Sequence, residues 1–133
     1  MQRSFMSKHV IHTANAPAAV GPYSQAVQAP SGKMIFLSGQ IGLVPSTGEM
    51  VSDKFEDQVK QAFSNMQAVI EAAGGSLENI IKLNLFLTDL GQFGIVNALM
   101  AERLPQPFPA RSTVGVSSLP KGAQFEIEAI IVV

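Results

Sequence analysis

Apolar residues recur at helical spacing through the middle of the chain. One stretch places them at steps of three and four residues: Phe55, Val59, Ala62, Phe63, Met66, Val69, Ile70 and Ala73. Such a stripe predicts an amphipathic helix with one face on the core. Asp53 is a suitable N-cap residue, and Gly74-Gly75 can adopt the left-handed conformation that ends many helices. We therefore expect the helix to begin just after Asp53 and to end before Gly74.

A strand and a second helix are predicted after this helix. Residues 80–88 alternate between a strongly apolar set and a mixed set, which is typical of a strand. The strongly apolar set is Ile81, Leu83, Leu85 and Leu87, and we expect the helix to cover it. Asp89 is a candidate cap for the second helix, which Pro105-Gln106-Pro107 would end. Its inward residues are expected to be Leu90, Phe93, Val96 or Asn97, and Met100.

Shorter apolar runs predict the remaining strands: His9–Thr13, Gln25–Gln28, Met34–Ser38, Ser112–Val116 and Phe125–Val133. The turn at residues 30–33 has hairpin length, so we expect Met34–Ser38 to return beside Gln25–Gln28. Met34–Ser38 is nearly all apolar, which is typical of burial on both faces. The order of strands, helix, strand, helix and strands predicts an α+β fold, with a mixed sheet and two helices packed on one face.

The other face of this sheet has no cover within one chain. Charged residues make up 14% of the sequence and apolar residues 47%, whereas a typical soluble domain has about 25% charged residues. A small monomer normally uses charge to cover its surface. We therefore expect another copy of the chain to cover the open face. The alternative is a monomer with an unusually apolar surface, which would invite aggregation.

Composition excludes several classes of protein. The chain has no cysteine, so it has neither disulfides nor a thiolate nucleophile. The net charge is −1 and no run of Lys or Arg occurs, which argues against a nucleic-acid partner. No apolar run approaches the roughly 20 residues of a membrane span, and the first residues do not form a signal peptide. We expect a cytoplasmic protein without membrane partners, in which residues 1–133 form one domain and residues 1–7 are a leader.

Arg111 is the most informative candidate for chemistry. It precedes a mostly apolar strand, where a guanidinium is costly without an anionic partner. Its planar fork matches a carboxylate or a phosphate. The alternative is a structural ion pair with an acidic neighbour.

Two acidic residues stand inside the last predicted strand. Glu126 and Glu128 are two residues apart, so both side chains lie on one face. A partly buried carboxylate can act as a base or position a water molecule. From the sequence alone, a solvated strand face explains either residue somewhat better.

The remaining candidates are weaker. Tyr23 lies in a rigid Gly-Pro-Tyr bend, Ser38-Gly39 can offer backbone N–H groups, and Asn97 lies near the apolar stripe of the second helix. Each of these also has an ordinary structural explanation. His9 and His12 are poorly spaced for a metal on a strand. Neither a nucleophile elbow nor a phosphate-binding glycine pattern occurs, so we expect no cofactor and no metal.

Several spaced segments resemble the RidA/YjgF family of reactive-intermediate deaminases, from about Lys8 to the carboxyl end. The strongest are Pro109–Val114, Leu119–Gly122 and Glu126–Ile130, joined by Asn15–Ala19, Gly21–Ala26, Ser38–Ile41 and the spacing of Phe93 and Asn97. The resemblance implies a chorismate-mutase-like fold and a homotrimer through the open face, with three pockets between subunits.

The resemblance also implies an activity and a site. Family members hydrolyse 2-aminoacrylate, 2-iminobutanoate and similar enamines or imines to 2-keto acids and ammonia, as 2-iminobutanoate/2-iminopropanoate deaminases, and so limit metabolite damage. By this resemblance Arg111 binds the substrate carboxylate and Glu126 handles the attacking water. The pocket-lining positions that match are Tyr23, Ser38, Gly39, Asn97 and Thr113.

Two departures and two alternative functions accompany this resemblance. Thr113 stands where many members carry cysteine, and the segment from Asn97 to Arg111 is about three residues shorter than is typical, which affects the pocket rim and substrate range. A non-catalytic or regulatory binder of small carboxylates on the same trimeric scaffold would keep Arg111 but would not need Glu126. RNA cleavage or inhibition of translation, proposed for family members, is disfavoured here by the near-neutral charge.

Overall fold

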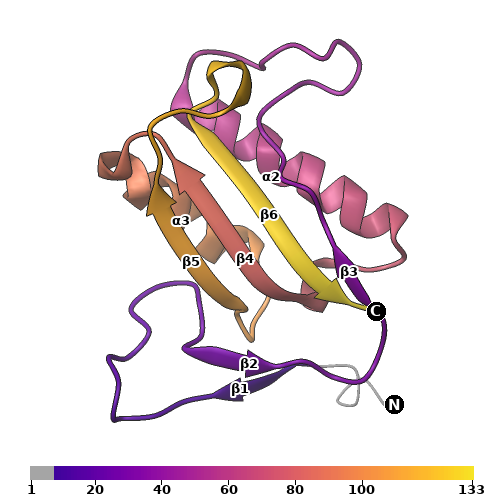
Figure 1. Cartoon of the computed structure of the whole chain (residues 1–133), viewed down its shortest axis with the longest axis vertical. Helices are drawn as coiled ribbons and strands as arrows, with labels where there is room; N and C mark the ends of the chain where they lie inside the picture. Colours follow the sequence, from indigo (N-terminus) through magenta and orange to yellow (C-terminus); the bar gives the residue numbers. More distant parts are fainter. Residues whose placement is uncertain (1–7) are drawn as a thin grey trace.

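A four-stranded mixed sheet forms the centre of the molecule (Figure 1). The computed structural model describes residues 8–133, and the expected leader at residues 1–7 lies outside them. The strands are β3 (Met34–Phe36), β4 (Ile80–Leu87), β5 (Ala110–Gly115) and β6 (Phe125–Val132). They lie in the order β3-β6-β4-β5, and β4 with β5 is the one parallel pair of neighbours in this sheet. A separate antiparallel pair joins β1 (His9–Ile11) to β2 (Ala26–Gln28).

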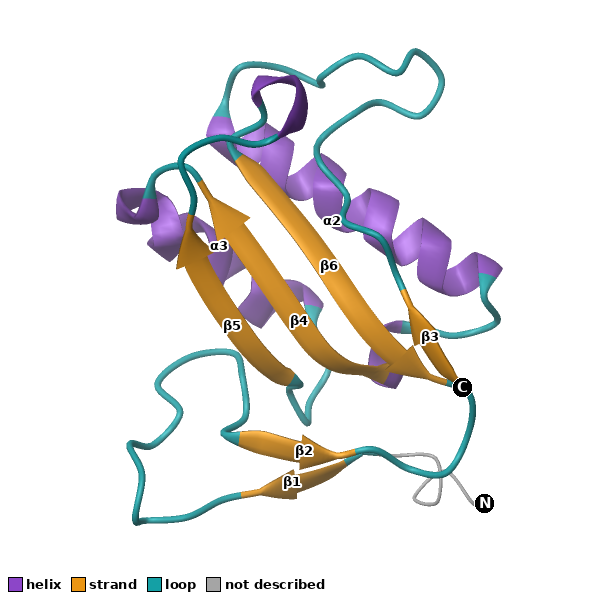
Figure 2. Cartoon of the chain, viewed as in Figure 1, coloured by secondary structure: helices purple, strands orange, loops and turns teal. Residues whose placement is uncertain are grey.

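Both long helices cover the same face of this sheet (Figure 2). They are α2 (Phe55–Ala72) and α3 (Phe93–Arg103), and three single 3-10 turns lie at Leu77–Asn79, Leu90–Gln92 and Pro120–Gly122. The core between helices and sheet holds Phe63, Met66, Leu83, Leu85, Phe125 and Ile127, all fully buried. The α+β fold with two helices on one face is therefore confirmed. Within residues 8–133, no helix combines the length and apolar character that a membrane span needs.

The predicted end of α2 is confirmed, but its predicted start is wrong by one residue. Gly74 has φ +87°, and the N–H groups of Gly74 and Gly75 donate to the carbonyls of Glu71 and Ile70. At the other end Lys54, not Asp53, is the N-cap residue and makes no side-chain cap. Ser52 takes over part of this role. Its Oγ accepts a hydrogen bond from the Lys54 N–H (3.0 Å) and donates one to the Asp57 carboxylate (2.8 Å).

The second helix begins differently from the prediction. The Asp89 carboxylate accepts a hydrogen bond from the Gly91 N–H, but it caps the 3-10 turn Leu90–Gln92 rather than α3 itself. The tighter turn points Leu90 outward, where it is 52% exposed, so its predicted inward position is wrong. Val96 and Met100 are fully buried, as predicted.

Two predictions about β3 are wrong. It does not form a hairpin with β2, because it pairs with β6 at the edge of the sheet, and Lys33 and Val133 exchange backbone hydrogen bonds beside it. The turn at residues 30–33 therefore carries the chain from one sheet to the other. The apolar run is also not buried on both faces, because Met34 and Phe36 are 55% and 69% exposed within one chain.

A bulge near the start of β4 changes which of its residues face the core. The register shifts between Ile80 and Lys82, so Ile80 is fully buried and Ile81 is only half-buried. After the bulge the prediction holds, since Leu83, Leu85 and Leu87 all face the helices. Their neighbours Lys82, Asn84 and Phe86 consequently face the open side of the sheet.

The open side carries a polar row in its middle, and a row toward each end that combines apolar residues with one charged residue. The middle row across β4, β6 and β5 is Asn84, Glu128 and Ser112. The row toward one end is Phe86, Glu126 and Val114, and the row toward the other end includes Phe36, Ile130 and Lys82. In both figures this face is turned to the viewer, and no helix covers it (Figures 1 and 2).

Candidate functional site

Arg111 lies on the helix-facing side of the edge strand β5. It is paired with Leu83 of β4, whose side chain is in the core, so Arg111 extends toward α3. There its Nη1 donates a hydrogen bond of 2.8 Å to Oδ1 of Asn97. The predicted neighbourhood of Arg111 and Asn97 thus arises because β5 packs beside α3. The strand begins at Ala110, so Arg111 belongs to it rather than preceding it.

Two aromatic rings flank the guanidinium. The Arg111 Cζ atom lies 4.8 Å from the centroid of the Tyr23 ring and 5.2 Å from that of Phe93. Such cation–π contacts orient the guanidinium and contribute about 0.5–2 kcal/mol each. Phe93 was predicted only as a core residue of the helix, and pattern alone does not distinguish a core aromatic ring from one that packs on a cation.

The bend that carries Tyr23 is tied to the start of β5. Ser24 N–H donates to the carbonyl of Pro109 (2.9 Å), and the Ser24 hydroxyl donates to the carbonyl of Phe108 (2.6 Å). The Tyr23 hydroxyl in turn accepts a 3.4 Å hydrogen bond from the Val20 N–H. The amino-terminal segment therefore reaches the site although about 85 residues separate it from Arg111 in the sequence.

No carboxylate neutralises Arg111 within residues 8–133, where its polar partner is the neutral Asn97. The alternative of a structural ion pair is therefore wrong for the described chain. Burial lowers the pKa of the guanidinium, and the nearby Tyr23 acts in the opposite direction. An arginine nevertheless stays protonated in proteins. The site thus holds a half-buried cation for which residues 8–133 supply no carboxylate partner.

A cavity of about 260 Å³ opens beside this cation. Its walls are Val20, Tyr23, Phe93, Asn97, Arg111 and Thr113. Four of the predicted site residues therefore share one cavity: Tyr23, Asn97, Arg111 and Thr113. Val20, which is 85% exposed, was not predicted, and no sequence pattern pointed to it. The arrangement can bind a small molecule that carries one carboxylate or phosphate.

Glu126 and Glu128 lie on the opposite, open side of the sheet. They share one face, as predicted, and Nδ2 of Asn84 donates a 3.0 Å hydrogen bond to the Glu128 carboxylate. Glu126 makes no such bond to a side chain within the described residues. Burial raises the pKa of the Glu126 carboxyl above its ordinary value, and the neighbouring Glu128 carboxylate raises it further. The raised pKa makes Glu126 a better proton acceptor than an ordinary glutamate.

Gly39 lies directly against the Glu126 carboxylate. A Cβ atom at position 39 would collide with Oε2 of Glu126, so only glycine leaves room for this carboxylate in its present position. The register here is fixed by the reciprocal backbone hydrogen bonds of Gln40 and Ile127. The neighbouring Ser38 is exposed. Ser38 and Gly39 are thus placed with Glu126 and not with the cavity that Arg111 lines.

Arg111 and Glu126 cannot act on one small molecule within a single chain. Arg111 pairs with Leu83 on one edge of β4, whereas Glu126 pairs with Phe86 on its other edge. Two strand spacings of about 4.8 Å and three residues at about 3.3 Å each separate their Cα atoms by about 14 Å. Their side chains also point to opposite faces of the sheet. The predicted site is therefore complete only if one copy of the chain supplies Arg111 and a second copy supplies Glu126.

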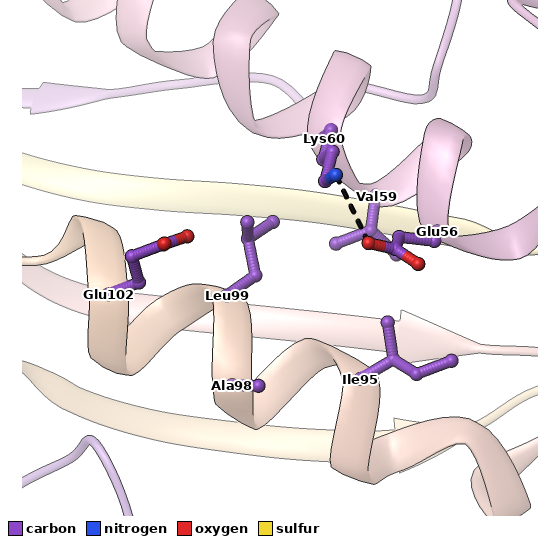
Figure 3. Close-up of a pocket in the computed structure, with 7 residues that line it drawn as sticks. All are labelled: Glu56, Val59, Lys60, Ile95, Ala98, Leu99 and Glu102. Carbon is purple, nitrogen blue, oxygen red and sulfur yellow. Dashed lines mark ion pairs between the residues drawn. The ribbon is translucent and has the colours of Figure 1, made fainter.

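A larger hollow lies between α2 and α3, on the side of the helices that faces away from the sheet (Figure 3). Its volume is about 410 Å³, and its floor is formed by apolar side chains such as Val59 and Leu99. Its single cation, Lys60, already forms a 3.1 Å ion pair with Glu56. None of the predicted site residues lines it. Judged by volume alone, this hollow would be the better candidate for a binding site. The cavity at Arg111 instead has a cation without a carboxylate partner and several converging polar groups, so we take that cavity as the candidate site.

The structure provides no cluster of metal ligands within residues 8–133. No three side chains of His, Asp or Glu come together there in a way that would hold a metal ion. His9 lies in β1, and His12 follows the end of that strand.

The sequence matches the family model described as Endoribonuclease L-PSP over residues 13–133. A 2-iminobutanoate/2-iminopropanoate deaminase of Dermatophagoides farinae is 48% identical over 126 residues, covering 95% of this chain and 97% of that protein. The human protein of the same name is 42% identical over 129 residues, covering 97% of this chain and 93% of that protein. The chain therefore belongs to the RidA/YjgF family.

Solved structures agree with this assignment. The crystal structure of RidA from the Antarctic bacterium Psychrobacter sp. PAMC 21119 superposes with a TM-score of 0.74 at 46% identity. The match covers 94% of this chain and 99% of that one. Proteins named as imine deaminases are thus found among the chain's relatives at 42% and 48% identity.

Proposed function

We propose that this protein hydrolyses small 2-imino acids, and the enamines that tautomerise to them, to 2-keto acids and ammonia. One observation carries the proposal: a half-buried arginine lies between two aromatic rings, has no carboxylate partner in the described part of the chain, and lines a small cavity. A guanidinium fork binds a carboxylate bidentately, which fixes the rest of a small molecule in place. The named activity of the relatives supports this reading.

The reaction needs only positioning and one proton acceptor. Arg111 holds the carboxylate, so that the C=N carbon of the imine faces a water molecule. Glu126 of a second copy accepts a proton from this water as its oxygen bonds to the carbon. The resulting tetrahedral adduct carries both the hydroxyl and the nitrogen. Glu126 passes this first proton to the nitrogen and then takes the proton of the new hydroxyl and passes it on as well. The C=O bond forms as the C–N bond breaks, so that one imine and one water give one keto acid and one ammonia.

The assembly that joins Arg111 and Glu126 is part of the proposal. We expect a homotrimer of the chorismate-mutase-like kind, with the open faces of the sheets turned toward one another. The exposed Phe36 and Val114 on that face, together with the half-buried Phe86, supply apolar area for such contacts. Each pocket would then combine Arg111, Tyr23, Asn97 and Thr113 of one copy with Glu126, Ser38 and Gly39 of the next.

A trapping assay tests the activity. An amino-acid oxidase generates the imine in situ, and semicarbazide traps the imine that survives. We expect the wild-type protein to suppress the trapped product. Arg111→Ala should lower kcat/KM by about two orders of magnitude or more, since it removes a charge-assisted bidentate contact.

Arg111→Lys is the matched control, because it keeps the charge but loses the fork. It should recover only part of the loss. Far-UV circular dichroism and light scattering should show an unchanged fold and assembly in both variants. Full activity of Arg111→Ala would refute the site. If wild type suppresses no trapped product with several precursors yet binds keto acids in an Arg111-dependent way, the protein is a carboxylate binder instead.

A further inference from the structure

Thr113 has a buried hydroxyl for which residues 8–133 provide no partner. Within this range, Thr113 Oγ1 is the buried side-chain polar atom without a hydrogen bond. Leaving such a group unpaired is costly, so nearly all of them are satisfied in folded proteins. A β-branched residue at this position would pack equally well as valine, without that cost. The hydroxyl is therefore free to pair with a group from outside the described residues.

Thr113 also lines the cavity beside Arg111. The two residues are alternate positions of β5, so their side chains emerge on the same face with Cα atoms about 7 Å apart. Two other polar atoms of the cavity already accept hydrogen bonds: Asn97 Oδ1 from Arg111, and the Tyr23 hydroxyl from the Val20 N–H. The staggered positions about the Cα–Cβ bond of Thr113 give its hydroxyl three possible directions.

We propose that the Thr113 hydroxyl selects substrates whose side chain carries a hydrogen-bonding group, such as a hydroxyl, over alkyl substrates of the same shape. This inference rests on the proposed function in one respect, since it takes Arg111 to hold the carboxylate. A small 2-imino acid anchored there extends its own side chain into the cavity, which is otherwise walled by the apolar Val20 and the ring of Phe93. A hydroxyl on that side chain satisfies Thr113, whereas a methyl group leaves it unpaired.

Two matched pairs of amino acids give the substrates for the test. Threonine and valine differ by a hydroxyl in place of a methyl on the third carbon, and homoserine and norvaline differ in the same way on the fourth. An amino-acid oxidase converts each to its imine, and the readout is the ratio of kcat/KM within each pair. Wild type should favour the hydroxylated member of at least one pair by about five- to tenfold, as expected for one hydrogen bond.

Thr113→Val and Thr113→Ser make the decisive comparison. Thr113→Val keeps the shape and removes the hydroxyl, so the preference should fall to about one or reverse, whereas Thr113→Ser should retain it. An unchanged ratio in Thr113→Val would overturn the inference. So would a smaller assembly of Thr113→Val by light scattering, because the hydroxyl would then serve a contact between copies.

Binding separates a failure of this inference from a failure of the deaminase proposal. The stable 2-keto acids of the same pairs can be titrated calorimetrically into the same proteins. If no imine is hydrolysed but the hydroxylated keto acids bind more tightly through Thr113, the deaminase proposal fails and the selectivity stands. If binding shows no hydroxyl preference either, the Thr113 inference fails independently of catalysis.

Discussion

At the scale of the residue, Glu126 is the group whose environment differs most from that of an ordinary surface carboxylate. It is flanked by Glu128 on the same strand and lies against the backbone of Gly39, which leaves it room but offers no cation. Both partial burial and the second carboxylate raise its pKa. A carboxylate in this state binds a proton more readily than a free glutamate does. This property suits a catalytic base, but the ionised form lowers the stability of the folded protein.

The acid limb of the pH–rate profile should report Glu126. If its ionised form takes the proton of water, kcat falls as pH drops through a pKa above the ordinary glutamate value of about 4.3. Glu126→Gln should abolish this limb and lower kcat by about 100-fold or more, with a smaller effect on KM. Glu128→Gln removes the neighbouring charge, so it should keep activity and shift the limb to lower pH. A limb that persists in Glu126→Gln would contradict this role.

The same shift has a consequence for stability. A carboxyl whose pKa is raised by folding contributes stability below its unfolded pKa and loses that contribution as pH rises through its folded pKa. Glu126→Gln should therefore raise the thermal midpoint at pH 7, and the gain should disappear below about pH 4. Glu49→Gln, at an exposed turn position, is the control and should show no such pH-dependent gain. An equal gain at all pH values would point to packing rather than charge.

At the scale of the element, α2 does more than cover the sheet. Its buried Asn65 donates hydrogen bonds to the carbonyls of Ile41 (3.1 Å) and Leu43 (2.8 Å), in the segment that follows Gly39. Its buried Gln58 accepts a hydrogen bond from the Gln124 N–H, next to the start of β6. One helix thus fixes both segments that meet at the Glu126 carboxylate.

Asn65→Ala should lower the free energy of unfolding by about 1–3 kcal/mol, because two carbonyl groups lose their partner. Urea denaturation measures this loss. Ser64→Ala changes the adjacent, exposed residue of the same helix and should stay within about 0.5 kcal/mol of wild type. If the two substitutions had equal effects, the two hydrogen bonds of Asn65 would contribute nothing measurable.

Local patterns predicted the elements well and their pairing less well. The spacing of Phe63, Met66 and Ile70 depends only on helical geometry, so it identifies α2 and its buried face directly. The pairing of β3 with β6 is set by a contact between residues about 100 positions apart, such as Lys33 with Val133, and no local pattern contains it. The cap at Lys54 and the bulge at Ile80 likewise depend on neighbours in space.

At the scale of the whole molecule, the main feature is the division of the candidate site between the two faces of one sheet. The alternation of side chains along a strand predicted that Glu126 and Glu128 share a face, because both belong to β6. This alternation says nothing about where Arg111 lies relative to Glu126. Their relative position depends on the register of β5 and β6 against β4. Four residues that line the cavity were thus named from the sequence, whereas Val20 and the separation of Arg111 from Glu126 were not.

Mixing two inactive variants tests whether the site is shared. Arg111→Ala retains Glu126, and Glu126→Gln retains Arg111. If each pocket takes these residues from different copies, random reassembly of an equal mixture restores about a quarter of the pockets. Refolding the two variants together and measuring kcat against wild type gives this fraction. A mixture no more active than the separate variants would show that one chain supplies both residues.

The proposed division of the site between two copies would also tie catalysis to abundance. If the acid–base group and the carboxylate anchor come from different copies, the working unit is a complex, and its amount falls more steeply than total protein on dilution. Specific activity, which is constant for a monomeric enzyme, would then rise with concentration until assembly is complete. A cell that makes little of this protein would have disproportionately little activity. Near the concentration at which the copies assemble, a modest change in expression would therefore change the activity by a larger factor.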